Sequence, residues 1–243
     1  MIVLYTDFGL RGPYIGQLQA AIYRYSPEAR VVNLIADAPV FNPKAAAYLL
    51  AAYVHEFAGN SVFLCVVDPG VGTAERMPVV VKAEDRAFVG PDNGLFDIVA
   101  KHANTQTVKH RIVWTPPRLS ASFHGRDLFA PVAALLDASR LPDDWLAPPE
   151  PMACHNIDAD LDEIIYLDDF GNAITGRRAA FVGDAAMLVI HGQELQRGRT
   201  FGDVAHGEAF WYENSSGLVE IAVNQGSAAG TLGLRIGQPF FWR

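Results

Sequence analysis

Short apolar runs alternate with helical patterns through the first part of the chain, and this alternation constrains the fold more than any other feature. Apolar runs at residues 2–5, 31–35 and 61–67 have the length of buried strands. Residues 14–25 lie between the first two runs and residues 42–57 between the second and third, and both carry apolar side chains at helical spacing. This β-α-β-α-β order predicts an α/β fold with a largely parallel sheet and helices on its faces.

Further elements are expected before the composition changes. Residues 79–89 predict a hairpin that turns at Glu84-Asp85, and residues 95–103 and 128–137 predict two more helices. Residues 141–156 then hold four prolines and no sustained periodicity, which indicates a linker.

Beyond the linker, short alternating apolar pieces are separated by glycine-rich turns, which is typical of a small antiparallel sheet or barrel. We therefore expect two domains. Residues 1–148 would form an N-terminal α/β domain with a Rossmann-like sheet. Residues 157–243 would form a smaller C-terminal antiparallel β-barrel domain.

Composition excludes several classes of protein. Half of the 243 residues are hydrophobic and 19% are charged, so a sizeable core is expected and global disorder is not. A net charge of −8 argues against nucleic acid or an anionic membrane as the main partner. Cys65 and Cys154 lie far apart, which suits a reducing compartment. With no signal peptide or spanning segment in the sequence, we expect a cytoplasmic protein.

Polar residues with glycines follow several of the predicted strands. Asp7 follows the first strand, Asp68 the third and residues 90–94 the hairpin, while residues 122–127 open a helix. In open α/β sheets, ligands bind beyond the carboxyl ends of the strands. Each stretch alone is also compatible with an ordinary turn. Their occurrence at strand ends of one predicted sheet favours a functional site.

Two other interpretations of these stretches stay open. Residues 68–72 are rich in glycine, but they lack the lysine and the spacing of a phosphate-binding P-loop. Asp7, Asp68, Asp92 and His124 could gather a divalent metal for a hydrolase, although no pair has the short spacing of a metal motif.

Taken together, the motifs resemble those of the S-adenosylmethionine hydrolase family, also called SAM hydroxide adenosyltransferases, which is related to the fluorinase and chlorinase. The matching segments occur in family order across residues 6 to 228: Thr6-Asp7-Phe8-Gly9, Val67-Asp68-Pro69-Gly70-Val71-Gly72-Thr73, Gly90-Pro91-Asp92-Asn93-Gly94-Leu95, Phe123-His124-Gly125-Arg126-Asp127, Asp169-Phe170-Gly171-Asn172 and Asn214-Ser215-Ser216-Gly217. The resemblance implies conversion of S-adenosylmethionine and water to adenosine and L-methionine, with no metal and no cofactor. It also implies a homotrimer whose sites lie between subunits.

The resemblance further assigns roles to individual residues. The catalytic set would be Asp68, Arg76 and His124, with Asp68 accepting hydrogen bonds from the attacking water. Asp7 would bind the ribose hydroxyls, and Asn172 would read the adenine edge. The full set of substrate-binding candidates is Asp7, Phe8, Phe41, Asn93, Asp168, Phe170, Asn172, Tyr212, Ser215, Ser216 and Ala228.

The same residues bear on the choice among reactions. A carboxylate at Asp68 would repel a halide, so Asp68 with His124 favours water over halide transfer. The sequence departs from the family pattern at two places. Position 12 is a glycine where the family usually has an acidic residue, and residues 34–39 lack the histidine that the family often has there. Arg76 is the only candidate for the family arginine. A non-catalytic sensor of adenosine or S-adenosylmethionine is therefore the main alternative, and a SAM-dependent halogenase a lesser one.

Overall fold

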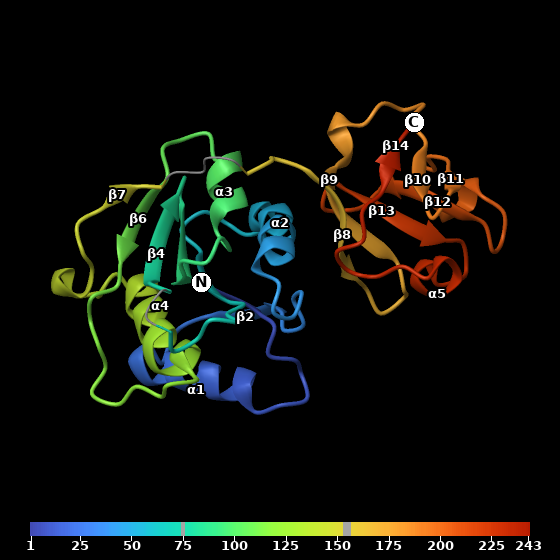
Figure 1. The fold of residues 1–243 in the computed structure, drawn as a ribbon. Coiled ribbons are helices and arrows are strands. Elements are labelled where there is room, and N and C mark those ends of the chain that lie inside the picture. The colour runs from blue at the N-terminus through green and yellow to red at the C-terminus, as the bar shows by residue number, and fades with distance from the viewer. Residues whose placement is uncertain (74–75, 153–156) are drawn as a thin grey trace. The chain divides into compact units, whose positions relative to one another are not determined.

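A computed structural model describes residues 1–73, 76–152 and 157–243. The chain forms two compact units, Met1–Leu50 with His55–Ile157, and Ala51–Val54 with Asp158–Arg243 (Figure 1). In the described ranges, no helix combines the length and apolar character needed to cross a membrane. Cys65 is a buried free thiol, whereas Cys154 lies outside the described residues.

The first unit contains a seven-stranded mixed sheet in the order β2-β1-β3-β5-β4-β6-β7. Its elements are β1 (Ile2–Thr6), α1 (Tyr14–Tyr25), β2 (Val31–Ile35), most of α2 (Pro43–Tyr53, of which residues 51–53 are grouped with the second unit), β3 (Val62–Val66), β4 (Pro78–Ala83), β5 (Arg86–Pro91), α3 (Asp97–His102), β6 (Val108–Arg111), a π-helical turn (Gly125–Phe129), α4 (Ala130–Asp137) and β7 (Glu150–Pro151). Strands β2, β1, β3 and β5 are parallel neighbours. Antiparallel pairing joins β5 to β4, β4 to β6 and β6 to β7.

The α/β class is confirmed, but the sheet is mixed rather than largely parallel. The predicted hairpin of β4 and β5 reverses the chain without a crossover helix, so it introduces antiparallel pairing. Strands β6 and β7 extend the antiparallel part, and the sequence analysis did not predict them. The sequence of β6, Val-Lys-His-Arg, has too few apolar residues to predict a strand from periodicity.

Part of the predicted linker belongs to the first unit. Glu150 and Pro151 form β7 and pair with Lys109 and Val108 of β6. Proline lacks a backbone N–H, so within a sheet it is confined mostly to edge strands, and β7 is the edge strand here. Pro151 therefore lies where the sheet ends.

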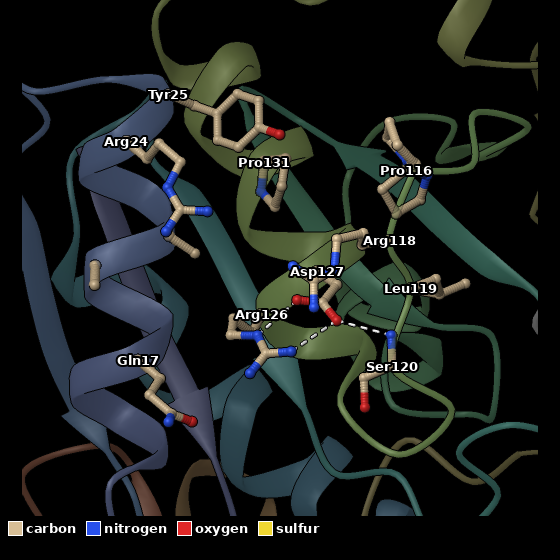
Figure 2. Close-up of a pocket in the computed structure, with 13 residues that line it drawn as sticks. Gln17, Arg24, Tyr25, Pro116, Arg118, Leu119, Ser120, Arg126, Asp127 and Pro131 are labelled. Carbon is tan, nitrogen blue, oxygen red and sulfur yellow. Dashed lines mark hydrogen bonds and ion pairs between the residues drawn. The ribbon is translucent and has the colours of Figure 1, made fainter.

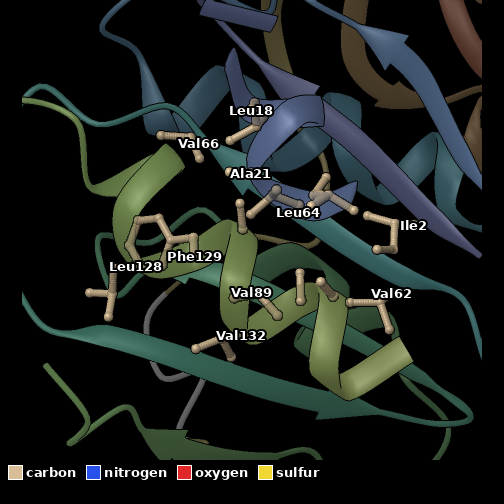
Figure 3. Packing of buried hydrophobic residues seen from close by; sticks show 14 of the residues in the cluster. Ile2, Leu18, Ala21, Val62, Leu64, Val66, Val89, Leu128, Phe129 and Val132 are labelled. Atoms are coloured by element: carbon tan, nitrogen blue, oxygen red, sulfur yellow. The ribbon is translucent and has the colours of Figure 1, made fainter. Parts of the chain in front are cut away.

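Helices cover both faces of the sheet (Figure 1), with α1 and α4 on one face and α2 and α3 on the other. Figure 3 shows the core under α1 and α4, where Leu18 of α1 and Phe129 pack near Leu64 of β3. Because side chains alternate along a strand, Phe63 points to the other face, where its ring stacks on Phe88 at 5.0 Å. Because helices cover both faces of the sheet, a ligand can reach the sheet only at the strand ends and the loops that follow them.

The second unit is antiparallel. Its four-stranded sheet has the order β12-β13-β9-β8, and a three-stranded sheet has the order β11-β10-β14. The elements are β8 (Leu161–Leu167), β9 (Ala173–Arg178), β10 (Leu188–Ile190), β11 (Gln193–Leu195), β12 (Ala209–Glu213), β13 (Leu218–Val223), α5 (Ala228–Leu232) and β14 (Phe241–Trp242). Their core includes the fully buried Trp211. The antiparallel prediction is confirmed, whereas closure into a barrel is not, because the described strands form two separate sheets.

Candidate active site

Asp7 and Asp68 lie at the same edge of the large sheet because of strand register. β1 and β3 are parallel neighbours, with Thr6 opposite Val66. The residues that follow these strands therefore leave the sheet side by side. The Asp7 N–H extends the pairing by donating to the Val66 carbonyl at 3.4 Å. The predicted gathering of polar strand ends is present for these two aspartates.

The carboxylate of Asp7 is oriented by the loop after β2. The Phe41 N–H donates to Asp7 Oδ2 at 3.2 Å. Phe41 has a φ of 57°, in the left-handed region that is unusual for a bulky residue. Phe41 as a residue is 73% exposed. Burial raises the pKa of Asp7, and the hydrogen bond from Phe41 opposes that shift. Asp7 thus keeps acceptor capacity near an exposed aromatic ring.

Arg76 joins the other two predicted catalytic residues. Its Nη2 atom lies 2.8 Å from Asp68 Oδ2, and the side chains of Arg76 and Asp68 are 6% and 3% exposed. The same Nη2 atom lies 3.1 Å from Nδ1 of His124. The guanidinium also lies 5.8 Å from the centre of the Phe129 ring. The three predicted residues form one cluster, in which the Arg76–Asp68 pair is buried and His124 is half-buried, and Arg76 lies between the other two.

The cluster has unused hydrogen-bonding capacity. Both carboxylate oxygens of Asp68, and Nε and Nη1 of Arg76, are buried, and no described residue meets them at hydrogen-bond geometry, although the Gly70 N–H is near enough to lower the pKa of Asp68. The ion pair at 2.8 Å is close, but it is not aligned as a hydrogen bond. Buried polar atoms nearly always find partners, so these oxygens indicate a place where a water or substrate hydroxyl binds.

Electrostatics make Asp68 a better base than an exposed aspartate. Burial raises the pKa of Asp68, the positive charge of Arg76 and the backbone N–H of Gly70 lower it, and the nearby carboxylate of Asp7 raises it. Burial also lowers the pKa of Arg76, against the effect of Asp68. A carboxylate with a raised pKa holds the proton of a bound water more strongly.

The geometry assigns the tautomer of His124. A guanidinium has only donors, so its contact with Nδ1 is a hydrogen bond only if Nδ1 accepts. The proton of the neutral ring then resides on Nε2. Burial and the charge of Arg76 both lower the pKa of His124, which favours this neutral form. His124 can therefore donate from Nε2.

A π-helical turn positions His124. The turn spans Gly125–Phe129, directly after His124, and π-helical turns often occur at functional sites. A Cβ on Gly125 would lie 3.3 Å from the Phe8 ring. The rings of Phe8, Tyr14 and Phe123 pack edge-on or tilted, with centroids 5.4–5.9 Å apart. Phe8 thus belongs to an aromatic cluster that supports the turn.

Asn93 and Asp92 have structural partners. The Asn93 side chain donates to the Val67 carbonyl at 2.9 Å and accepts from the Leu95 N–H at 3.3 Å, so it supports the backbone next to Asp68. Asp92 is paired with Lys109 at 2.8 Å. Among the described residues, no three His, Cys, Asp or Glu side chains group as metal ligands.

The second unit carries the other candidates, around a turn that ends β8. Asp168 holds this turn, because its carboxylate accepts from the Asn172 N–H at 2.7 Å and from the Asn172 side chain at 3.0 Å. Asn172 is buried, whereas Phe170 is 80% exposed. A hollow beside the turn has a lining that includes Asp168, Phe170, Asn172, Ile174, Phe201, Tyr212, Asn214, Ser215, Ser216 and Glu220. Seven of the predicted residues thus lie in this unit, and six of them line the hollow.

Ala228 differs from the other six. It is fully buried at the start of α5 and packs in the core of the second unit.

Glu220 is a residue of this hollow that the sequence analysis missed. It is 5% exposed, and it accepts from the Tyr212 hydroxyl at 2.6 Å and from the Asn214 side chain at 2.9 Å. Oδ1 of Asn214 in turn accepts from the Ser216 N–H at 3.0 Å. Burial raises the pKa of Glu220, and Asp168 adds to the rise. A glutamate inside the apolar run Leu-Val-Glu-Ile-Ala-Val was the available signal.

Comparison with known proteins agrees with this arrangement. The model of the SAM hydroxide adenosyltransferase N-terminal domain matches residues 2–145, and that of the C-terminal domain matches residues 162–241. The (R)-S-adenosyl-L-methionine hydrolase of Thermus thermophilus is 37% identical, with 96% of each chain covered. That of Salinispora tropica is 35% identical, with 96% of this chain and 93% of the relative covered. A crystal structure of a conserved protein from Thermotoga maritima is 31% identical, with a TM-score of 0.87 and complete coverage of both chains. The chain belongs to the SAM hydroxide adenosyltransferase family.

Proposed function

We propose that this protein hydrolyses S-adenosyl-L-methionine to adenosine and L-methionine. The observation that carries the proposal is the cluster of Asp68, Arg76 and the half-buried His124, in which both buried Asp68 oxygens lack a partner at hydrogen-bond geometry among the described residues. Two relatives of nearly full length are named (R)-S-adenosyl-L-methionine hydrolases, which supports the same substrate.

The reaction matches the chemistry of the cluster. The water oxygen forms a bond to ribose C5′ while the C5′–S bond breaks. The electron pair of the C5′–S bond stays on sulfur. The sulfonium becomes the neutral thioether of methionine, so no general acid is required. The attacking water loses one proton, and Asp68 accepts hydrogen bonds from that water and draws its proton. Arg76 keeps Asp68 ionised, because its Nη2 atom lies 2.8 Å from Asp68 Oδ2 and both side chains are buried.

His124 and Asp7 complete the proposed active site. The neutral His124 ring can donate from Nε2, which helps to fix the position of the water. The Asp7 carboxylate would accept from both hydroxyls of the ribose, with the Phe41 N–H fixing its orientation. Because Asp7 and Asp68 follow adjacent strands, the ribose hydroxyls and C5′ would lie over the same edge of the sheet.

The second unit would hold the rest of the substrate. The exposed Phe170 ring offers a face for stacking of the adenine, and Asn172 offers an amide to its edge. Ser215 and Ser216 lie in a turn held by Asn214, and they would meet the methionine end. Water is favoured over halide as the nucleophile, because the charge of Asp68 would repel an anion.

Four further features are part of the proposal. The reaction would need no metal and no cofactor. The protein would act as a homotrimer in which the α/β domain of one subunit and the antiparallel domain of the next share a substrate. The antiparallel domain would have the β-barrel form that the family resemblance implies. The location would be the cytoplasm, as the sequence predicts.

The test is incubation of the purified full chain with S-adenosylmethionine, with and without a chelator, followed by chromatography. We expect adenosine and methionine in equal amounts in both samples. Intact substrate would overturn the hydrolase. Calorimetry separates the alternative, since a sensor would bind adenosine tightly and form no product. Activity lost on chelation and restored by a divalent metal would favour the metal-dependent hydrolase instead.

A further inference from the structure

Figure 2 shows a second hollow on the first unit, with a volume of about 910 Å³. It lies between helix α1, the loop of residues 116–120, and the π-helical turn that leads into α4. The volume is within the range of small-molecule sites. Its lining does not include Asp68, Arg76 or His124. We call it the arginine-lined hollow, since three arginines from three segments border it.

One of these arginines is already neutralised. Arg126 contacts Asp127 through two parallel bonds, Nε to Oδ1 at 2.6 Å and Nη2 to Oδ2 at 2.9 Å. Asp127 also accepts from the Ser120 N–H at 2.8 Å. Asp127 is the only acidic residue of the lining, and Arg126 and Ser120 occupy its carboxylate.

The other two arginines carry uncompensated charge. Arg24 of α1 and Arg118 of the loop are exposed, and neither forms an ion pair within the part of the chain that the structure describes. The chain as a whole has a net charge of −8, so a cavity with two uncompensated positive charges is a local exception. The guanidinium fork matches the paired oxygens of a phosphate and has donors only, so an anion is the complementary ligand.

The rest of the lining suits an organic group attached to that anion. Tyr25, Pro116, Pro117 and Leu119 provide apolar surface. The walls are also tethered: the Ser120 N–H holds the loop to Asp127, and Arg140 Nη2 donates to the Tyr25 carbonyl at 2.9 Å. Tethered walls reduce the entropy lost when a ligand binds.

We propose that the arginine-lined hollow binds a small phosphorylated molecule with a diphosphate or longer phosphate chain. Arg24 and Arg118 approach from different segments, so each takes the oxygens of a different phosphoryl group. Tyr25 and the prolines contact the organic part. The inference does not depend on the proposed reaction, because the residues that carry it lie outside the Asp68 cluster.

The test is calorimetric titration of the full chain with inorganic pyrophosphate at low ionic strength. The variants are the double substitution R24A/R118A and the matched control Arg30→Ala, which removes an exposed arginine of the same unit outside the hollow. We expect wild type and Arg30→Ala to bind alike, and the double variant to bind at least about tenfold more weakly. Added salt should weaken binding, because exposed charges are screened.

Three outcomes would overturn the proposal. They are no binding of pyrophosphate by wild type at millimolar concentration, equal binding by the double variant, or orthophosphate binding as tightly as pyrophosphate. Adenosine binding, measured in the same variants, should not change. If the double variant binds neither adenosine nor pyrophosphate, the substitutions disrupt the unit. The single variant Arg24→Gln must then bind adenosine as wild type does and bind pyrophosphate more weakly, or the proposal fails.

Discussion

Nη2 of Arg76 lies 2.8 Å from a carboxylate oxygen of Asp68 and 3.1 Å from Nδ1 of His124, so a single guanidinium nitrogen contacts both residues. Arg76 and Asp68 are almost completely buried. The pair therefore links stability to chemistry: the same charge that keeps Asp68 ionised also compensates for its burial.

Replacing Arg76 by methionine should destabilise the fold by about 3 kcal/mol, because breaking a buried ion pair leaves an uncompensated charge. The double substitution Arg76→Met with Asp68→Asn should recover much of this loss, since no buried charge remains. Urea denaturation of the single and double variants measures both effects. Additive losses in the double variant would show that the two residues do not interact.

Asp68→Asn keeps the shape of the side chain and removes its negative charge. We expect kcat for S-adenosylmethionine hydrolysis to fall by about 10²- to 10⁴-fold, the range for loss of a general base. Affinity for adenosine should stay within about twofold, because Asp68 contacts the water rather than the nucleoside. Asp85→Asn, an exposed aspartate paired with Arg86, is the control and should retain full activity. Full activity of Asp68→Asn would remove Asp68 from the mechanism.

The rate should depend on pH through two groups that must both be deprotonated. The pKa of Asp68 lies above its ordinary 3.8, and the pKa of His124 lies below its ordinary 6.5. As pH falls below neutral, Asp68 and His124 gain protons and kcat should fall, whereas it should be flat at neutral pH. The loss should be shallower in His124→Asn, because only one group then titrates. A kcat that rises between about pH 7 and about pH 5 would contradict the assignment.

Gly90 has no room for a side chain. A Cβ there would lie 2.2 Å from the Cys65 carbonyl oxygen on the adjacent strand and 3.0 Å from the Phe96 ring. Gly90→Ala should therefore destabilise the fold by about 1–3 kcal/mol, since the backbone must move. Gly16→Ala is the matched control in α1, where no atom lies within 4 Å of the added Cβ. It should stabilise by about 0.5–1 kcal/mol through helix propensity. Equal unfolding midpoints for the two variants would refute the crowding argument.

Glu220 should act as a positioning residue for the hollow in the second unit. Glu220→Ala leaves the Tyr212 hydroxyl and the Asn214 amide without their acceptor, so KM for S-adenosylmethionine should rise more than kcat falls. Glu220→Gln keeps an acceptor oxygen and should restore most of the affinity. Steady-state kinetics with calorimetry of adenosine separate this role from a global loss of fold. Identical kinetics of Glu220→Ala and wild type would exclude it.

Much of the first unit could be predicted from local pattern. The helix at residues 14–25 and the strand at 31–35 have the bounds that periodicity predicted. Strand β9, at the centre of the second sheet, was missed because Gly176, Arg177 and Arg178 interrupt its apolar pattern. Its position between β13 and β8 depends on pairing with strands distant in sequence, and no local window contains that information.

The candidate site shows the same division. The sequence alone identified the motifs that contain Asp7, Asp68 and His124, since turn residues at strand ends are local features. The family resemblance had already singled out Asp68, and the tertiary structure gave the physical reason: Asp68 faces Arg76, whereas the carboxylate of Asp92 pairs with Lys109. Only the pairing of β12 with β13 placed Glu220 opposite Tyr212. Local sequence determines which residues can carry charge at a strand end, whereas long-range strand register and burial determine which of those charges meet.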